Sequence, residues 1–392
     1  MEENAFINSP PCPVAETTDL LGNNVRWTWA CRILDRPESY TLDAHAADDP
    51  HAGDLALVRV TGIGNHSRMV TADNKKLRIY VGDLLVGVFG NRYATDAFEG
   101  EVQGVGSLSV LTAGGMIGTV KSQHRQIDKS TDVAFIGFLR DEKGRRANLK
   151  RLKFRVAFPK NPVRNLLVVI GTGMNSGKTT VAVKLIKGLS EMGLRVAACK
   201  LTGSVSNRDQ DEMRAAAARS VIDFSDYGFP STYLCGKAEL LDLCSTILAD
   251  TEKVQPDVII MEVADGFLQR ETAMLLAEPS IKKIITGLVF TADSAPAALY
   301  GVERLRQLHY PIIAVSGALT SAPLAVQEFR EQSDMAVGSS ADSGKGLVKL
   351  VRGFLDAQAG ARDFQASTSR RWIGLHNGRR SFGSTPALLR AS

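Results

Sequence analysis

The sequence predicts an α/β protein, with a mostly parallel sheet covered by helices on both faces and a smaller β-rich, barrel-like domain in front of it. From residue 164 onward, apolar strand-like runs alternate with helical patterns, which is typical of right-handed crossovers in a parallel sheet. Before residue 160, short β-type runs are separated by Gly and Asp turns. A chain of 392 residues, 44% of them hydrophobic, is too long for one ordinary core, so two domains are expected.

Residues 1–25 are expected to be a flexible leader and residues 26–160 the β-rich domain. Within it, strands are expected at residues 26–34, 55–60, 77–80, 84–89 and 133–139. Gly-Asp pairs at 53–54 and 82–83 each precede an apolar run, which resembles turns entering the strands of a small barrel. Residues 121–155 are basic but poor in aromatic residues, which favours a solvated hairpin over a nucleic-acid surface.

Pro159 and Pro162 mark the boundary before the α/β domain, residues 161–358. Strands are expected at residues 166–170, 195–200, 258–263, 283–290 and 312–315. Helices are expected at residues 178–192, 209–220, 238–249, 295–308 and 344–357. The tail, residues 359–392, carries arginines among small polar residues and is expected to be disordered or to dock on a partner.

The segment GTGMNSGKTT, residues 171–180, predicts a phosphate-binding loop between a buried strand and a helix. Backbone N–H groups and the helix N-terminus attract phosphate there, Lys178 can reach the outer phosphates, and Thr179 can offer its hydroxyl to Mg²⁺. The usual P-loop pattern has glycine at the position of Thr172, whereas this chain has Gly-x5-Gly-Lys-Thr. The alternative is a glycine-rich turn in the core. The expected nucleotide contacts in the loop are Gly173, Met174, Asn175, Ser176, Gly177, Lys178, Thr179 and Thr180.

Polar residues follow the other strands. In a parallel sheet the ligand lies beyond the carboxyl ends of the strands, so Lys200, Glu262 and the loop at Ser316 and Gly317 are expected to converge on the P-loop. Lys200 could equally be a solvated strand end. Glu262 follows the apolar run 258–261, and a buried carboxylate there needs a cation or hydrogen-bond donors.

A further magnesium ligand is expected in the acidic segment 207–214. Asp209 is preferred over Asp211, the alternative being an acidic helix start favoured by the helix dipole. The expected Mg²⁺ ligands are therefore Thr179, Asp209 and Glu262. The segment 264–272 mixes glycine with polar residues and is expected to contact substrate or phosphate.

The segment 171–179 resembles the variant P-loop of dethiobiotin synthetase and of the amidotransferase relatives that make cobyric and cobyrinic acid derivatives, where the first glycine is also displaced. The resemblance covers residues 164–320 and includes Lys200, Asp209 and Glu262 in order. It implies that the aspartate and glutamate join the P-loop threonine at Mg²⁺ and that the lysine lies close to the reacting groups. Dethiobiotin synthetase has an Ala-Gly-Gly type loop after its glutamate, so Val-Ala-Asp-Gly at 263–266 implies a different substrate. Uncharacterised P-loop proteins with a β-rich domain ahead of the P-loop resemble the layout more closely.

The nucleotide is expected to be ATP, because no Asn-Lys-x-Asp signature for guanine is present, and its base is expected near Ser316, Gly317 and Ala318. Chromosome-partitioning ATPases have an additional lysine five positions before the P-loop lysine, and this chain has Gly173 there. The sequence therefore argues against a dimerising switch ATPase of that kind. Two functions stay open. The first is an ATP-dependent ligase, cyclase or kinase-like enzyme that activates a carboxylate or carbamate through a mixed phosphate anhydride, with Lys178 and Lys200 as catalytic residues. The second is a nucleotide-gated regulatory or assembly ATPase acting on a protein partner.

Composition limits the partners. Lys and Arg exceed Asp and Glu by 47 − 42 = 5, too little to indicate nucleic acid. The odd number of cysteines, 5, with no Cys-x-x-Cys pair, indicates a reducing compartment, and a cytoplasmic location is expected. No apolar run is long enough to cross a membrane. A small-molecule substrate and a homodimer or higher homo-oligomer are expected.

Overall fold

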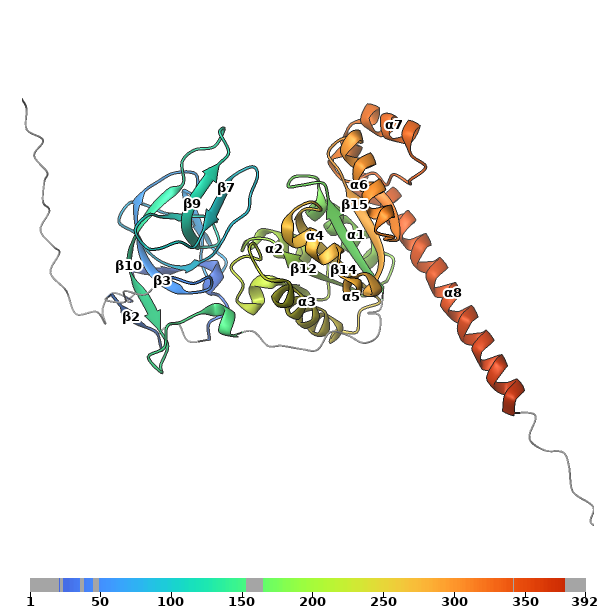
Figure 1. The fold of residues 1–392 in the computed structure, drawn as a ribbon, viewed down its shortest axis with the longest axis horizontal. Coiled ribbons are helices and arrows are strands. Elements are labelled where there is room, and N and C mark those ends of the chain that lie inside the picture. Colours follow the sequence, from blue (N-terminus) through green and yellow to red (C-terminus); the bar gives the residue numbers. More distant parts are fainter. Residues whose placement is uncertain are drawn as a thin grey trace, which may run out of the picture.

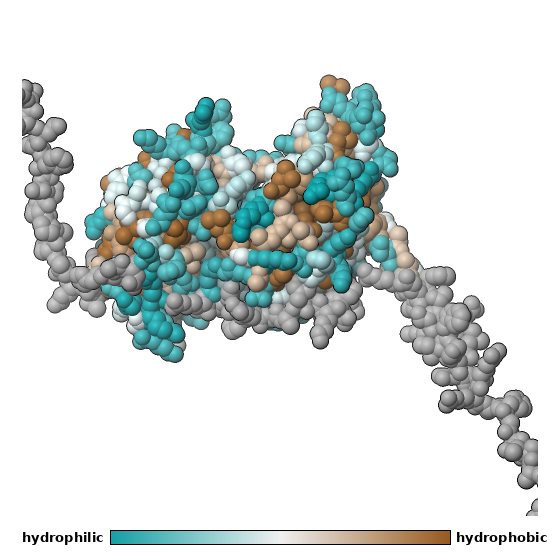
Figure 2. Space-filling model, viewed as in Figure 1, coloured by the Kyte–Doolittle hydropathy of each residue, from teal (hydrophilic) through white to brown (hydrophobic). Residues whose placement is uncertain are grey.

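The computed structural model describes residues 21, 24–35, 39–44, 49–152, 165–340 and 342–377. A β-rich part and an α/β part lie side by side, and the last helix extends away from the α/β part (Figure 1). On the face drawn in Figure 2, hydrophilic and hydrophobic residues are interspersed over both parts. Most of the expected leader, and the tail after residue 377, lie outside the described residues.

The β-rich part closes on itself. Strand pairing runs from β6 through β3, β10, β8 and β9 and back to β6, while β1, β2 and β7 pair along this ring and β4 and β5 form a separate pair. A closed ring leaves no edge among its members, which is the barrel that the sequence predicts. The strands are β1 (Val25–Trp27), β2 (Thr41–Asp43), β3 (Leu55–Gly62), β4 (Arg68–Val70), β5 (Lys76–Arg78), β6 (Leu84–Phe89), β7 (Phe98–Glu101), β8 (Leu108–Val110), β9 (Met116–Gln123) and β10 (Thr131–Arg140).

The first expected strand is shorter than the sequence indicates. β1 ends at Trp27, and Trp29–Cys31 form a 3-10 turn instead. The Thr28 hydroxyl donates to the Val86 carbonyl at 2.7 Å, and this bond anchors the turn on β6. The prediction of a strand over 26–34 is therefore wrong beyond residue 27, because three apolar residues fold into the barrel core as a turn.

The α/β part contains a parallel sheet in the order β13-β12-β14-β11-β15-β16, and every neighbouring pair in it is parallel. The strand that leads into the P-loop, β11, is central and fully buried, as its apolar sequence predicts. The strands are β11 (Leu166–Gly171), β12 (Val196–Thr202), β13 (Val221–Asp223), β14 (Val258–Gly266), β15 (Ile285–Thr291) and β16 (Ile312–Ser316).

Helices cover both faces of this sheet. Residues of α1, α2 and α8 pack on the face that Leu167 and Val169 share, and residues of α3 to α7 pack on the face of Leu166, Val168 and Ile170. This confirms the expected layered fold. The helices are α1 (Lys178–Glu191), α2 (Arg208–Ala215), α3 (Lys237–Glu252), α4 (Arg270–Leu276), α5 (Pro279–Ile284), α6 (Ala295–Gln307), α7 (Pro323–Gln332) and α8 (Lys345–Asn377).

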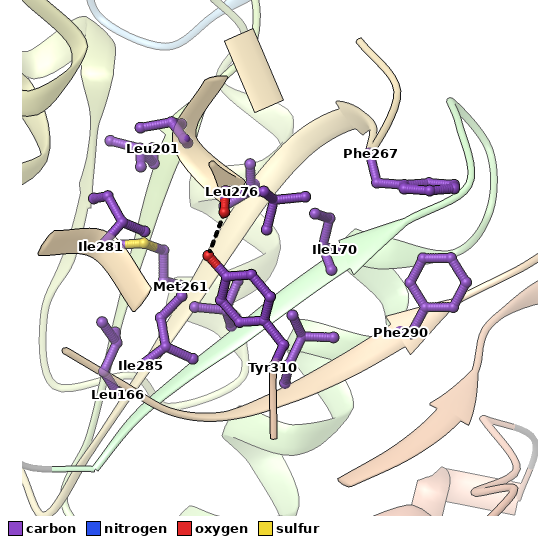
Figure 3. Packing of buried hydrophobic residues seen from close by; sticks show 14 of the residues in the cluster. Leu166, Ile170, Leu201, Met261, Phe267, Leu276, Ile281, Ile285, Phe290 and Tyr310 are labelled. Atoms are coloured by element: carbon purple, nitrogen blue, oxygen red, sulfur yellow. Dashed lines mark hydrogen bonds between the residues drawn. The ribbon is translucent and has the colours of Figure 1, made fainter. Parts of the chain in front are cut away.

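One of the two core clusters of the α/β part lies under α3 to α7 (Figure 3). The ring of Phe267, just beyond β14, meets that of Phe290 on β15 edge to face, with centroids 5.5 Å apart. The buried Tyr310 hydroxyl donates to the Leu276 carbonyl at 3.0 Å, which satisfies its hydrogen bond inside an apolar cluster. The Phe267–Phe290 contact comes directly after β14, the strand that carries Glu262 and Asp265.

Several elements of the α/β part differ from the sequence prediction. α2 ends at Ala215 instead of residue 220, because Ala217 adopts a positive φ of 69° and the chain turns into β13. β15 begins at Ile285, since the residues before it form α5. α8 continues to Asn377 instead of ending at 357, so helix enters the segment expected to be a tail.

No helix among the described residues is long and apolar enough to cross a membrane. Four cysteines lie in the described part of the chain, and all four are buried and free: Cys31, Cys199, Cys235 and Cys244.

Candidate functional site

The P-loop has the conformation that its sequence predicts. β11 leads into the loop, and α1 begins at Lys178, whose ammonium donates to the Gly173 carbonyl at 2.7 Å. Gly177 has a φ of 94°, and a Cβ there would lie 3.0 Å from the Cα of Gly317, so both conformation and space require glycine. Burial lowers the pKa of Lys178, while nearby carboxylates, first that of Glu262, oppose the shift. A lysine ammonium is thus positioned inside the loop.

The structure brings the three expected magnesium ligands together. The Thr179 hydroxyl lies 3.1 Å from Glu262 Oε1 and 3.5 Å from Asp209 Oδ1. Glu262 is only 1% exposed, and its Oε2 has no hydrogen-bond partner among the described residues. Asp211 instead contacts Asn74, Asn207 and Arg214, which agrees with the preference for Asp209.

Lys200 lies between the two carboxylates. Its ammonium pairs with Asp209 and lies 3.5 Å from Glu262 Oε1. Burial opposes the charged form of Lys200, but Glu262 and Asp209 outweigh it and raise the pKa of the lysine. Burial likewise favours protonated Asp209, yet Lys200 holds the pKa of that carboxyl below its usual range. For Glu262 burial prevails and raises the pKa.

These residues fit a magnesium ion, although the described part of the chain has no cluster of three His, Cys, Asp or Glu side chains arranged to hold a metal. Mg²⁺ is typically bound by one or two carboxylates together with phosphate oxygens and water. Two carboxylates and a hydroxyl at the N-terminus of α1 match that requirement, and Glu262 Oε2 is an oxygen without a partner among the described residues.

A cavity of about 480 Å³ opens over the P-loop and is walled by both parts of the molecule. Met174, Asn175, Gly177 and Thr180 line it, together with the lysines, Thr179 and the two carboxylates described above. Asp265, in the segment expected to contact substrate or phosphate, also lines it. The β-rich part contributes His66, Arg92, Tyr93, Thr112 and Gly114.

The sequence did not predict that the β-rich part contributes to the wall of this cavity. Asn175 of the P-loop donates to Asp96 Oδ2 at 2.7 Å, and Asn207 donates to Asn74 Oδ1 at 2.8 Å. Asp96 and Asn74 lie in turns without a recognisable motif, so only the docking of the two parts reveals them.

Four of the expected nucleotide contacts lie against or behind the loop. The Ser316 hydroxyl is buried and donates to the Gly338 carbonyl at 2.6 Å. Gly317 packs on Gly177, and Ala318 N donates to the Ser176 carbonyl at 3.0 Å. The Ser176 hydroxyl bonds with that of Thr291 at 2.8 Å. These residues support the P-loop, and their contact with a nucleotide stays a prediction.

Fold and site together are those of a P-loop α/β protein. No protein-family model matches the chain, and no curated protein matches it. Among solved structures it is similar to the signal recognition particle receptor FtsY from Elizabethkingia anophelis in complex with GDP, with a TM-score of 0.35 and 15% identity. That match covers 51% of this chain and 65% of the FtsY chain, slightly less than two thirds.

Two further solved structures match with similar TM-scores and sequence identities. FtsY from Mycoplasma mycoides matches with a TM-score of 0.31 and 15% identity over 53% of this chain and 75% of that chain. The kinase domain of Escherichia coli tyrosine kinase ETK matches with a TM-score of 0.29 and 16% identity over 39% of this chain and 66% of that chain. None of the three is a dethiobiotin synthetase, so that resemblance stays a prediction from the sequence.

Proposed function

We propose that this protein binds Mg-ATP and uses it to activate a carboxylate or carbamate of a small molecule. The observation that supports this most is the convergence of Thr179, Asp209 and Glu262 within 3.5 Å at the N-terminus of α1, beside the ammonium of Lys178. A phosphate cradle, a lysine and paired oxygen ligands are the parts that phosphoryl transfer requires.

Each residue has a separate task. Lys178 neutralises charge on the transferred phosphoryl group, and Thr179, Asp209 and Glu262 hold Mg²⁺, which when bound neutralises the outer phosphates. Lys200 orients the acceptor after exchanging its carboxylate partners for an anionic ligand. In the transfer, an acceptor oxygen forms a bond to the terminal phosphorus while the bond from that phosphorus to the ADP oxygen breaks, and ADP leaves with the electron pair.

The volume of the cavity favours a small acceptor over a macromolecular one. Residues of the β-rich part line the cavity together with the P-loop, and about 480 Å³ lies within the range of small-ligand sites. The second function, a regulatory ATPase, predicts instead that a protein partner stimulates ATP hydrolysis.

Thermal unfolding tests nucleotide binding directly. Mg-ATP at a hundred times its Kd stabilises a protein by about 2.7 kcal/mol, so the Tm of the wild type is expected to rise. We expect Lys178→Ala to abolish this rise and leave the Tm without ligand nearly unchanged. Lys187→Ala, exposed on the same helix, is the control and keeps the full shift. Equal Tm shifts in all three proteins contradict the assignment of the P-loop as the nucleotide-binding site.

The acceptor class needs a second measurement. Phosphate release is followed with Mg-ATP and a panel of small carboxylic acids and amines. Stimulation by one of these metabolites supports the proposed enzyme. Stimulation only by a protein or by nucleic acid contradicts it and supports a nucleotide-gated switch.

A further inference from the structure

Arg92 is a cation of the β-rich part that faces the P-loop cavity without an anionic partner. Its backbone is fixed by two hydrogen bonds with Gly100, of 2.8 and 3.0 Å. Its guanidinium donates to the Leu111 carbonyl and lies over the buried ring of Phe98, 5.7 Å from the centroid. Among the residues that the structure describes, no carboxylate forms an ion pair with Arg92.

An unpaired, partly buried arginine is costly, because burial disfavours the charged form unless an anion compensates. Burial lowers the pKa of Arg92 to about 10, and the more distant carboxylates of Asp96 and Asp265 offset only part of this shift. The side chain therefore stays charged at neutral pH. A guanidinium has five N–H donors and one is used by Leu111, so the others are available to an anion in the cavity.

The loop that carries Arg92 touches the P-loop itself. Asp96, four residues further on, accepts from Asn175, which lies three residues before Lys178. Arg92 and Lys178 line the same cavity, and the carboxylate of Asp265 acts electrostatically on both. The two parts of the molecule therefore each contribute a cation to the wall of one cavity.

We propose that Arg92 is a catalytic residue that the β-rich part supplies to the P-loop, where its guanidinium donates to oxygens of the phosphoryl group during transfer. This rests on the proposed function. While the acceptor oxygen bonds to phosphorus and the bond to the ADP oxygen breaks, negative charge shifts onto the leaving oxygen and over the phosphoryl oxygens. A planar donor fixed in the cavity stabilises that distribution more than the ground state. Arg92 itself forms no covalent bond.

Binding of ADP with aluminium fluoride, a mimic of the transferred phosphoryl group, tests this without knowledge of the acceptor. We compare the Kd of Mg-ADP and of Mg-ADP with aluminium fluoride for the wild type, Arg92→Gln, Arg92→Lys and the control Arg59→Ala, an exposed arginine on β3. Glutamine removes the charge and keeps a donor for Leu111. The Tm of each protein without ligand shows whether it folds.

We expect Arg92→Gln to bind Mg-ADP like the wild type but to lose about 10²-fold or more in affinity for the fluoride complex. Arg92→Lys keeps part of that affinity, and Arg59→Ala keeps all of it. Equal weakening of both ligands, or no weakening of either, overturns the role of Arg92, as does a wild type that binds Mg-ADP without any gain from aluminium fluoride. A wild type that binds no nucleotide at all contradicts the proposed function itself, which distinguishes that failure from the failure of the role of Arg92.

Discussion

Asp265 combines an unusual backbone conformation with a shifted acid strength. Its φ is 63°, in the left-handed region, and burial raises its pKa to about 6 although Lys178, Lys200 and Arg92 lower it. Because the folded pKa lies above the usual 3.8, the folded protein holds this proton more tightly than the unfolded chain. Stability therefore falls as pH rises from about 4 through about 6.

Asp265→Asn is expected to remove this loss of stability at higher pH. Asparagine cannot ionise, and it tolerates the left-handed region at least as well as aspartate. The Tm of the variant relative to wild type is expected to be higher at pH 7.5 than at pH 4.5, as measured by thermal unfolding without ligand. Asp128→Asn, at an exposed position, controls for the loss of a surface carboxylate. A difference that stays constant between the two pH values contradicts the assigned cause.

Candidate site residues within a contiguous motif could be found from sequence, and those placed by tertiary docking could not. Lys178 and Thr179 follow from a strand, loop and helix contiguous in the chain, and Glu262 follows from the apolar run 258–261 before it, although β14 continues to Gly266. Arg92 lies in a loop that looks ordinary in sequence. Its position in the wall of the P-loop cavity becomes visible only in the structure, where Asp96 of the same loop accepts a hydrogen bond from Asn175 of the P-loop.

Glycines within helices provide a test of packing. Gly301 lies in α6, and a Cβ there would meet Phe290 Cζ at 2.1 Å. Gly353 lies exposed in α8 and has nothing within 4 Å of its Cβ position. Alanine is favoured over glycine in a helix by about 1 kcal/mol, so only steric contact distinguishes the two sites.

We expect Gly353→Ala to raise the free energy of unfolding by up to about 1 kcal/mol and Gly301→Ala to lower it by about 1–3 kcal/mol, because Phe290 must move in a packed core. Urea unfolding of both variants measures the difference. The same sign for both changes contradicts the packing of α6 on β15.

In the α/β part, long segments with periodic apolar residues were predictable from sequence, and short segments were missed. α1 and α6 end within one residue of their expected bounds, since each combines an amphipathic pattern with a clear stop. α4, α5 and α7 were not foreseen, because two are under eight residues and the third carries little buried apolar surface. β13 has three residues and adds only an edge to the sheet.

The two parts of the molecule are joined by a buried cation. Arg32 of the β-rich part is 10% exposed, donates to the Ser225 hydroxyl at 2.9 Å and pairs with Asp226. The buried Asp223 carboxylate lies 3.7 Å away. Removing one member of such a group leaves a buried charge uncompensated.

Arg32→Ala is therefore expected to lower the free energy of unfolding by about 3 kcal/mol, within the range for broken buried pairs. Arg26→Ala is the control, because the Arg26–Asp83 pair is more exposed, at 29% and 22%, and is expected to contribute less than about 1 kcal/mol. Denaturant unfolding followed by tryptophan fluorescence and by circular dichroism measures both. Equal losses for the two variants contradict the importance of this junction.

The class of each part was predictable, whereas their docking was not. Alternating strands and helices indicated the parallel sheet, and turn-punctuated short runs indicated the barrel. Polar contacts such as Lys150 with Glu239, at 2.6 Å, join residues far apart in sequence and leave no periodic signal. Such contacts emerge only once both parts are folded.

Val205 follows Lys200 and precedes Asp209, yet its side chain is fully buried within the core of the β-rich part. Its backbone N donates to the Pro230 carbonyl at 2.9 Å, and a Cβ on Gly114 would lie 2.7 Å from its carbonyl oxygen. Val205 thus links the barrel core to the segment that carries Lys200 and Asp209. We therefore expect the barrel and the segment between Lys200 and Asp209 to move together.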